Sequence, residues 1–200
     1  MGAVMTTPEK MLEISTRDHQ MTVLRDDGLY RHIRFAKPGT GIWRFDLVTW
    51  PGHLVITGDL EDFHFARIPD MFEFFRKPVG YVNPHYWAEK LQGPVRSMSF
   101  SRDVFKRLVF DHFRDWCRWN DGPHRPLWRA ICNEVLLDEY GEMGDETMAH
   151  YALTQFRHGD FEFTDSWEWE LKDYDFHFLV ALHAIVWGIN RYDAAKAAVA

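Results

Sequence analysis

The stretch from Trp43 to Arg67 constrains the fold more than any other part of this sequence. Its side chains alternate, so that Trp43, Phe45 and Leu47 fall on one face of an extended strand and the residues between them fall on the other. At residues 50–53, the sequence Trp-Pro-Gly-His places proline at the second position of a type II turn and glycine at the third, where φ is positive. The stretch therefore predicts an antiparallel β-meander with one buried face.

Further strands and helices are predicted from the same kinds of pattern. Strands are predicted over residues 30–36, 53–57 and 63–67. Beyond Pro69 the apolar spacing becomes helical, and helices are predicted over residues 70–76, 83–91, 101–116, 123–139, 145–157 and 174–197. Asp70 and Ser101 are predicted to cap the first and third of these helices. The segment 160–170 alternates again, which predicts a return to the sheet or an extended edge. The predicted fold class is α+β, an N-terminal antiparallel β-meander packed against a C-terminal set of about five helices.

The last predicted helix is apolar nearly all round over residues 176–189, which predicts burial on every side. This run is shorter than a membrane span requires and contains two histidines. The length of 200 residues favours one domain, so we predict a polar N-terminal arm over residues 1–27 and a single α+β domain over residues 28–200. Two cysteines and no apolar leader predict a reduced, cytoplasmic protein.

Charge is distributed unevenly along the chain, whose formal net charge is −7. Residues 96–129 contain eight arginines and lysines against four aspartates, whereas residues 130–175 contain thirteen acidic residues against two basic ones. The acidic part also carries tryptophans, so it is suited to a partner with a basic surface. The predicted contact residues are Glu162, Asp165, Trp167, Glu168, Trp169, Glu170 and Asp173.

Eleven histidines invite a metal hypothesis, but their spacing matches no zinc motif. His53 and His64 are predicted to meet across the meander, with Asp62 nearby, and a metal-dependent hydrolase built on these three residues is one hypothesis. We favour ordinary hydrogen-bonded histidines. No catalytic residue, bound metal or cofactor is predicted.

A second hypothesis explains the abundance of tryptophan by a ligand pocket. The pocket would lie between the sheet and the helices and would hold a nucleotide or another small molecule by stacking. Its predicted lining is Trp43, Trp50, Arg67 and Trp87.

A basic stripe on the predicted helix 101–116 and the residues after it suggests nucleic-acid binding, since Trp116 and Trp119 lie beside it. The stripe consists of Arg102, Lys106, Arg107, Arg114 and Arg118. The acidic composition of the whole chain argues against direct nucleic-acid binding. We favour salt bridges between the stripe and the acidic half of the chain.

Several aromatic-rich motifs resemble an uncharacterised accessory protein family of tailed bacteriophages and prophages. The resemblance covers about residues 28–91 and 167–193, and it rests on residues 50–52, 58–59, 70–76, 83–90, 173–178, 187–189 and 192–193. It implies a protein of the host bacterial cytoplasm that blocks a defence component, such as a CRISPR effector, a defence nuclease or a nucleotide signal. No active-site residue follows from the resemblance.

The leading prediction is a non-enzymatic phage protein that inhibits a host defence system through its acidic, aromatic face. Such a face is suited to the basic groove of an enzyme that acts on nucleic acid, because carboxylates steer the encounter and aromatic residues anchor it. No membrane association is predicted.

Overall fold

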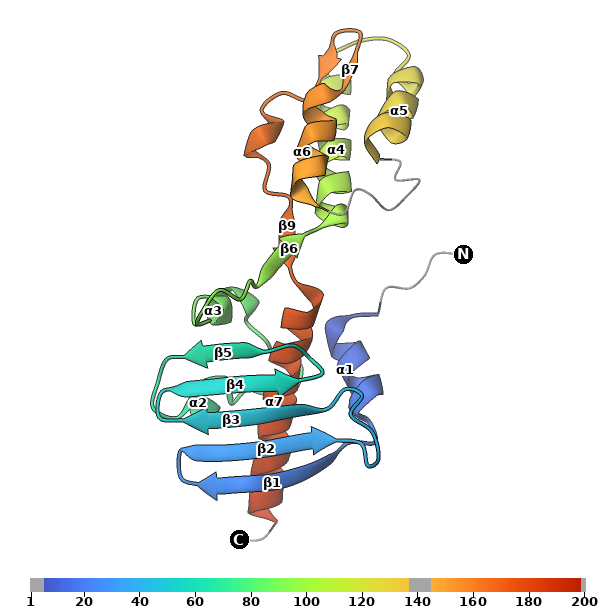
Figure 1. Ribbon diagram of the computed structural model, residues 1–200. Coiled ribbons are helices and arrows are strands. Elements are labelled where there is room, and N and C mark those ends of the chain that lie inside the picture. The colour runs from blue at the N-terminus through green and yellow to red at the C-terminus, as the bar shows by residue number, and fades with distance from the viewer. Residues whose placement is uncertain (1–5, 137–144, 199–200) are drawn as a thin grey trace. The chain divides into compact units, whose positions relative to one another are not determined.

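The computed structural model describes residues 6–136 and 145–198 (Figure 1). Contacts divide the chain into two compact units. Residues 1–97 and 174–200 form the first, called here the sheet unit, and residues 98–173 form the second, called the helical unit. The sequence pattern predicted one domain over residues 28–200, whereas the contacts separate the helical unit from the elements that precede and follow it.

The sheet unit contains an antiparallel sheet of five strands in the order β1-β2-β3-β4-β5. These strands are β1 (Gln20–Asp27), β2 (Tyr30–Ala36), β3 (Phe45–Trp50), β4 (His53–Gly58) and β5 (Phe63–Ala66). Gly52, between β3 and β4, has φ of 86°, the value that the predicted type II turn requires. Phe45 and Leu47 are fully buried, which confirms the buried face of the meander.

Helix α7 (Phe176–Ala197) runs behind all five strands, and one face of the sheet packs against it (Figure 1). Asp175 caps this helix by accepting hydrogen bonds from two backbone amides of its first turn. Three shorter helices belong to the same unit: α1 (Pro8–Thr16), α2 (Met71–Phe75) and α3 (Pro84–Ala88). The predicted core position of the last helix is confirmed, because ten of its residues are buried.

The N-terminal segment differs from the predicted polar arm. Thr7 caps α1, which packs along α7, and residues 20–27 pair with β2 as the edge strand of the sheet. Seven of the eight residues of β1 are exposed, and the pairing register shifts between Val23 and Arg25. An edge strand with a bulge and two accessible faces shows no clear alternation. Residues 8–27 therefore form a helix and an edge strand of the sheet unit.

The helical unit is built around the long helix α4 (Arg102–Cys117), which Ser101 caps as predicted. Its other helices are α5 (Arg125–Ile131), the π-helical turn η1 (Cys132–Leu136) and α6 (Glu146–Gln155). The remaining elements are β6 (Met98–Phe100), β7 (Arg157–His158), β8 (Phe161–Glu162), the 3-10 turn η2 (Ser166–Glu168) and β9 (Lys172–Tyr174). Buried side chains of α4, α5, α6 and the β7–β8 hairpin share one apolar core.

One of the two predictions for residues 160–170 was a return to the five-stranded sheet. These residues do not pair with that sheet. They form a short hairpin arm and the turn η2 instead. Phe161 and Phe163 point into the core of the helical unit, so the alternation reflects local burial. No helix in the described part of the chain is long and apolar enough to cross a bilayer.

Candidate functional site

The two units differ sharply in charge. The sheet unit contains fourteen basic and fourteen acidic residues, whereas the helical unit contains nine basic and sixteen acidic residues. The net charge of −7 therefore belongs entirely to the helical unit. The negative electrostatic field of the helical unit attracts basic partners and repels nucleic acid.

The β7–β8 hairpin turns carboxylates outward from the core of the helical unit. Phe161 and Phe163 are buried, so the neighbouring side chains of Asp160 and Glu162 are exposed. His112 of α4 holds the hairpin, because its ring lies 5.7 Å from that of Phe161 and its Nε2 lies 3.1 Å from the carbonyl oxygen of Glu162. The predicted contact residue Glu162 is therefore exposed on a backbone segment that the contacts with His112 hold in place.

The turn η2 presents a second group of the predicted contact residues. Trp167 is 70% exposed, although a tryptophan of the core would be covered. Asp165 adopts the left-handed conformation with φ of 52° and reverses the chain just before the turn. The side chains of Glu168 and Glu170 are exposed on either side of Trp169.

Trp169 and Asp173 have different surroundings from the rest of the predicted face. Trp169 is half-buried, and its ring packs against those of Phe163 at 5.9 Å and His112 at 5.5 Å. Trp169 thus supports the fold of the face. Asp173 is exposed on β9.

A groove of about 440 Å³ lies between the end of α4 and the β7–β8 hairpin. Its lining consists of His112, Asp115, Trp116, Trp119, Asn120, Asp160, Glu162 and Thr164. Only Glu162 among these belongs to the predicted contact residues. The α4 residues were missed as partners of the acidic segment because about 45 positions of sequence separate the two walls.

Two arginines of the basic stripe pair with carboxylates close to them on α4 rather than with residues 130–175. Arg114 lies 3.0 Å from Asp111, and Arg118 lies 2.9 Å from Asp115, one turn away on the same helix. Such i,i+3 pairs are typical of an exposed helix face. In the acidic segment, Glu162 pairs instead with Arg157 at 2.9 Å.

The four residues predicted to line an aromatic pocket do not converge between the sheet and the helices. Trp87 is 2% exposed and packs edge-on against Phe75 in the core at 4.8 Å. Trp50 lies on the opposite face of the sheet, since its neighbour Thr49 is the buried one. Trp43 lies in the loop before β3 with φ of 58°, and Arg67 is exposed after β5.

A different cavity, of about 460 Å³, lies beside α1 in the sheet unit. One wall is a stripe of α7 formed by His183, Trp187 and Arg191, and the other wall includes Glu9 and Glu13 of α1. The guanidinium of Arg191 lies over the ring of Trp187 at 4.7 Å. Burial lowers the pKa of His183, which favours a neutral imidazole in this cavity.

His53 and His64 meet on the outer face of the sheet, as the meander predicted. Nδ1 of His53 lies 2.9 Å from Nε2 of His64, and Trp50 stacks on His53 at 5.0 Å. Burial and the neighbouring His53 lower the pKa of His64. In the described ranges, no three His, Cys, Asp or Glu side chains gather as metal ligands would, so Asp62 does not complete a site with this pair.

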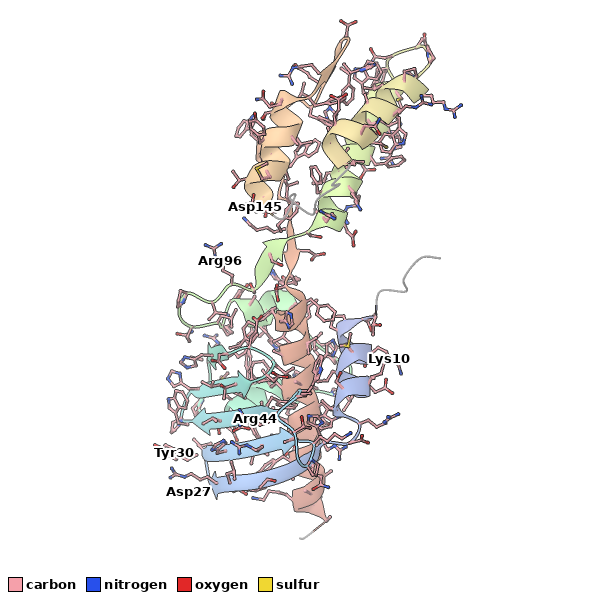
Figure 2. The ribbon with its side chains drawn as sticks, turned by 45° about the vertical axis from the view of Figure 1, so that its right-hand side comes forward. Lys10, Asp27, Tyr30, Arg44, Arg96 and Asp145 are labelled. Atoms are coloured by element: carbon pink, nitrogen blue, oxygen red, sulfur yellow. The ribbon has the colours of Figure 1, made fainter. Side chains whose placement is uncertain are left out.

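The outer face of the sheet also carries an ion cluster across β2 and β3. Asp46 accepts hydrogen bonds from Arg34 at 2.8 Å and from His32 at 2.7 Å. Burial alone would raise the pKa of Asp46, but the bonds from Arg34 and His32 hold it below its usual value. Figure 2 shows Tyr30 and Asp27 at the edge of this face and Lys10 on α1. The contacts of Asp46 with Arg34 and His32 help to fix the register of β2 relative to β3.

Comparison with known proteins shows no relationship on which a function could be based. No protein-family model matches the chain, and no curated protein or solved structure matches it significantly. The resemblance to proteins of tailed phages therefore stays a hypothesis. The candidate site is defined by charge and geometry alone.

Proposed function

We propose that this protein is a non-enzymatic binding protein whose helical unit captures a partner with a basic surface. The observation that carries the proposal is the separation of charge, because the entire net charge of −7 lies in residues 98–173. Complementary charge accelerates association and rejects partners of the same sign. The sheet unit has no net charge, so we assign the recognition of the basic partner to the helical unit.

The exposed side chains of η2 supply the anchor that such a surface needs. Tryptophan is enriched among residues that contribute most to binding, and Trp167 is 70% exposed beside Glu168. The half-buried Trp169 keeps this turn on the core. We therefore take Trp167, Glu168 and Glu170 as the centre of the contact surface.

The resemblance to phage proteins suggests where the partner is found. In an infected bacterium, a defence nuclease or CRISPR effector holds nucleic acid in a basic groove, and an acidic surface with aromatic anchors can occupy such a groove. The proposed role is accordingly that of an anti-defence inhibitor. This part of the proposal rests on the resemblance alone.

Reversal of charge at Glu168 and Glu170 tests the proposal. The double variant Glu168→Lys/Glu170→Lys is expected to reduce capture of the partner about tenfold, because long-range attraction becomes repulsion. Raising the salt concentration from about 50 mM to about 500 mM should have a similar effect on the unaltered protein, since the Debye length then falls from more than 10 Å to less than 5 Å. Capture from infected cells, quantified by mass spectrometry, measures both effects.

The matched control applies the same change of net charge to the sheet unit. Asp62 and Glu73 are exposed there, and Asp62→Lys/Glu73→Lys is expected to leave capture within about twofold. Capture that responds to neither pair of substitutions nor to salt would contradict the acidic surface. Equal losses in both double variants would assign the effect to net charge rather than to this surface.

Binding of a small molecule is a second candidate function, and the cavity beside α1 favours it. Trp187 can stack on a ring, while Arg191 and Glu9 can meet groups of opposite charge. A ligand at about 100 times its Kd should stabilise the protein by about 2.7 kcal/mol. A thermal shift with nucleotides and cyclic oligonucleotides measures this, and a shift that persists unchanged in Arg191→Ala would place the ligand elsewhere.

A further inference from the structure

The groove beside α4 joins acidic and aromatic walls. Its lining contains three carboxylates and two indoles but no lysine or arginine, although α4 carries four basic residues along its length. Asp160 and Glu162 come from the hairpin, whereas Asp115, Trp116 and Trp119 come from the end of α4. Carboxylates beside aromatic faces are the surroundings that proteins provide for organic cations.

Two carboxylates of the groove already bind guanidinium groups of the protein itself. Nε of Arg157 lies 2.9 Å from Glu162, and Nη1 of Arg118 lies 2.9 Å from Asp115. Neither arginine belongs to the lining of the groove. Asp160 is exposed and has no ion pair or hydrogen bond through its side chain within the described residues. One carboxylate therefore remains open to an incoming cation.

The two indoles of the groove contribute differently to the fold, because only one of them packs against the core. Trp116 packs edge-on against Phe161 at 5.4 Å, which holds its ring in place. Trp119 follows the end of α4 and is 87% exposed. A tryptophan left so open gives the fold little by burial, and its face is available for stacking.

The chemistry favours arginine over other ligands. Phosphate groups would meet the open carboxylate of Asp160 and no lysine or arginine in the lining, which disfavours a nucleic-acid strand. Lysine carries a compact ammonium, whereas the planar guanidinium of arginine stacks on an indole and binds a carboxylate through two donors. We infer that this groove receives an arginine side chain of the basic partner, an inference that rests on the proposed function.

The full chain, titrated with synthetic peptides by isothermal calorimetry at low salt, tests the inference. Nona-arginine and nona-lysine carry equal charge, and nona-arginine is expected to bind at least fivefold more tightly. Trp119→Ala should weaken nona-arginine about threefold and leave nona-lysine within about 1.5-fold, the size expected for one exposed cation–π contact. Asp160→Asn should weaken nona-arginine about fivefold, because it removes the open carboxylate.

Matched controls use exposed residues of the same types outside the groove. Trp167→Ala and Asp165→Asn remove an exposed tryptophan and a carboxylate from η2 and the residue before it. They are expected to leave the preference for nona-arginine unchanged, even where they weaken both peptides. Since Trp119 and Asp160 are exposed, their substitution should not alter the melting temperature, which checks that each variant is folded.

The outcomes separate the inference from the proposed function. Equal binding of the two peptides, weakened by Glu168→Lys/Glu170→Lys but not by Trp119→Ala, would overturn the arginine groove and leave the acidic contact surface standing. Failure of both peptides to bind at low salt would overturn the proposed function itself. A preference for nona-arginine that Trp119→Ala and Asp160→Asn both abolish would support the groove.

Discussion

Replacement of Asp70 by alanine is expected to destabilise the sheet unit by about 3–5 kcal/mol, because it breaks a largely buried ion pair and leaves one charge without its partner. Asp70 accepts two hydrogen bonds from Arg31, at 2.8 and 3.0 Å, and caps α2 through the backbone amide of Phe72 at 2.9 Å. The Arg31 side chain is only 11% exposed and lies over the ring of Phe72. Urea denaturation followed by circular dichroism measures the loss.

Asp193→Ala is the matched control for this variant. It removes a similar two-bond pair with Arg76, but those side chains are 36% and 47% exposed. We expect a cost below about 1 kcal/mol, as is usual for surface ion pairs. Equal costs for Asp70→Ala and Asp193→Ala would contradict the importance of burial.

The contribution of Asp70 should also depend on pH. Burial alone would raise its pKa, but the bonds from Arg31 and from the amide of Phe72 hold the pKa below the usual value. A lowered carboxyl pKa stabilises the folded state fully above the unfolded value of about 3.9, and this stabilisation is lost as pH falls through the folded pKa. The difference between the unaltered protein and Asp70→Ala should therefore be constant above about pH 5 and shrink below about pH 4.

Replacement of Gly188 by valine is expected to cost about 3 kcal/mol through overpacking between α7 and the sheet. A Cβ atom at this position would lie 2.9 Å from Cδ1 of Leu47 and 2.9 Å from Cε2 of Phe35. Phe35 cannot move easily, because its ring stacks on Phe45 at 4.9 Å and meets Trp187 at 5.2 Å. Thermal and urea denaturation of the full chain measure the effect.

Two further variants identify the cause of that loss. Ala195→Val places the same side chain on the exposed part of α7 and should cost about 0.5 kcal/mol, which is the difference in helix propensity. In a double-mutant cycle, Leu47→Ala should recover part of the loss of Gly188→Val, because it makes room for the new methyl groups. Strict additivity of the two substitutions would show that the clash is not at Leu47.

Prediction from the sequence succeeded where structure is set by neighbours along the chain. The turn at Pro51 and Gly52 and the caps at Asp70 and Ser101 are local, so each was predicted and each is present. The strand β1 was missed because its two faces are accessible and its pairing shifts at a bulge. Its place in the sheet depends on β2, and composition alone did not reveal it.

The candidate site was predictable only in part, for the same reason. The acidic character of residues 160–173 is a property of composition, and the meeting of His53 with His64 follows from hairpin register. The groove needs the end of α4 and the hairpin to lie together, and that arrangement depends on the burial of Phe161 and Phe163 against α4, α5 and α6. Trp87, which was expected to line a pocket, is instead 2% exposed and packs in the core.

The sequence by itself determined the α+β class, the register of the meander, the helix caps and the uneven charge, since turn chemistry, period and composition act over a few residues. Only the tertiary structure decided that α7 crosses the sheet after an insertion of 76 residues, that the whole net charge lies in that insertion, and that Trp119 and Asp160 line the same groove. These features depend on contacts between distant segments, whose free energy comes from burying apolar surface that no single segment can bury alone.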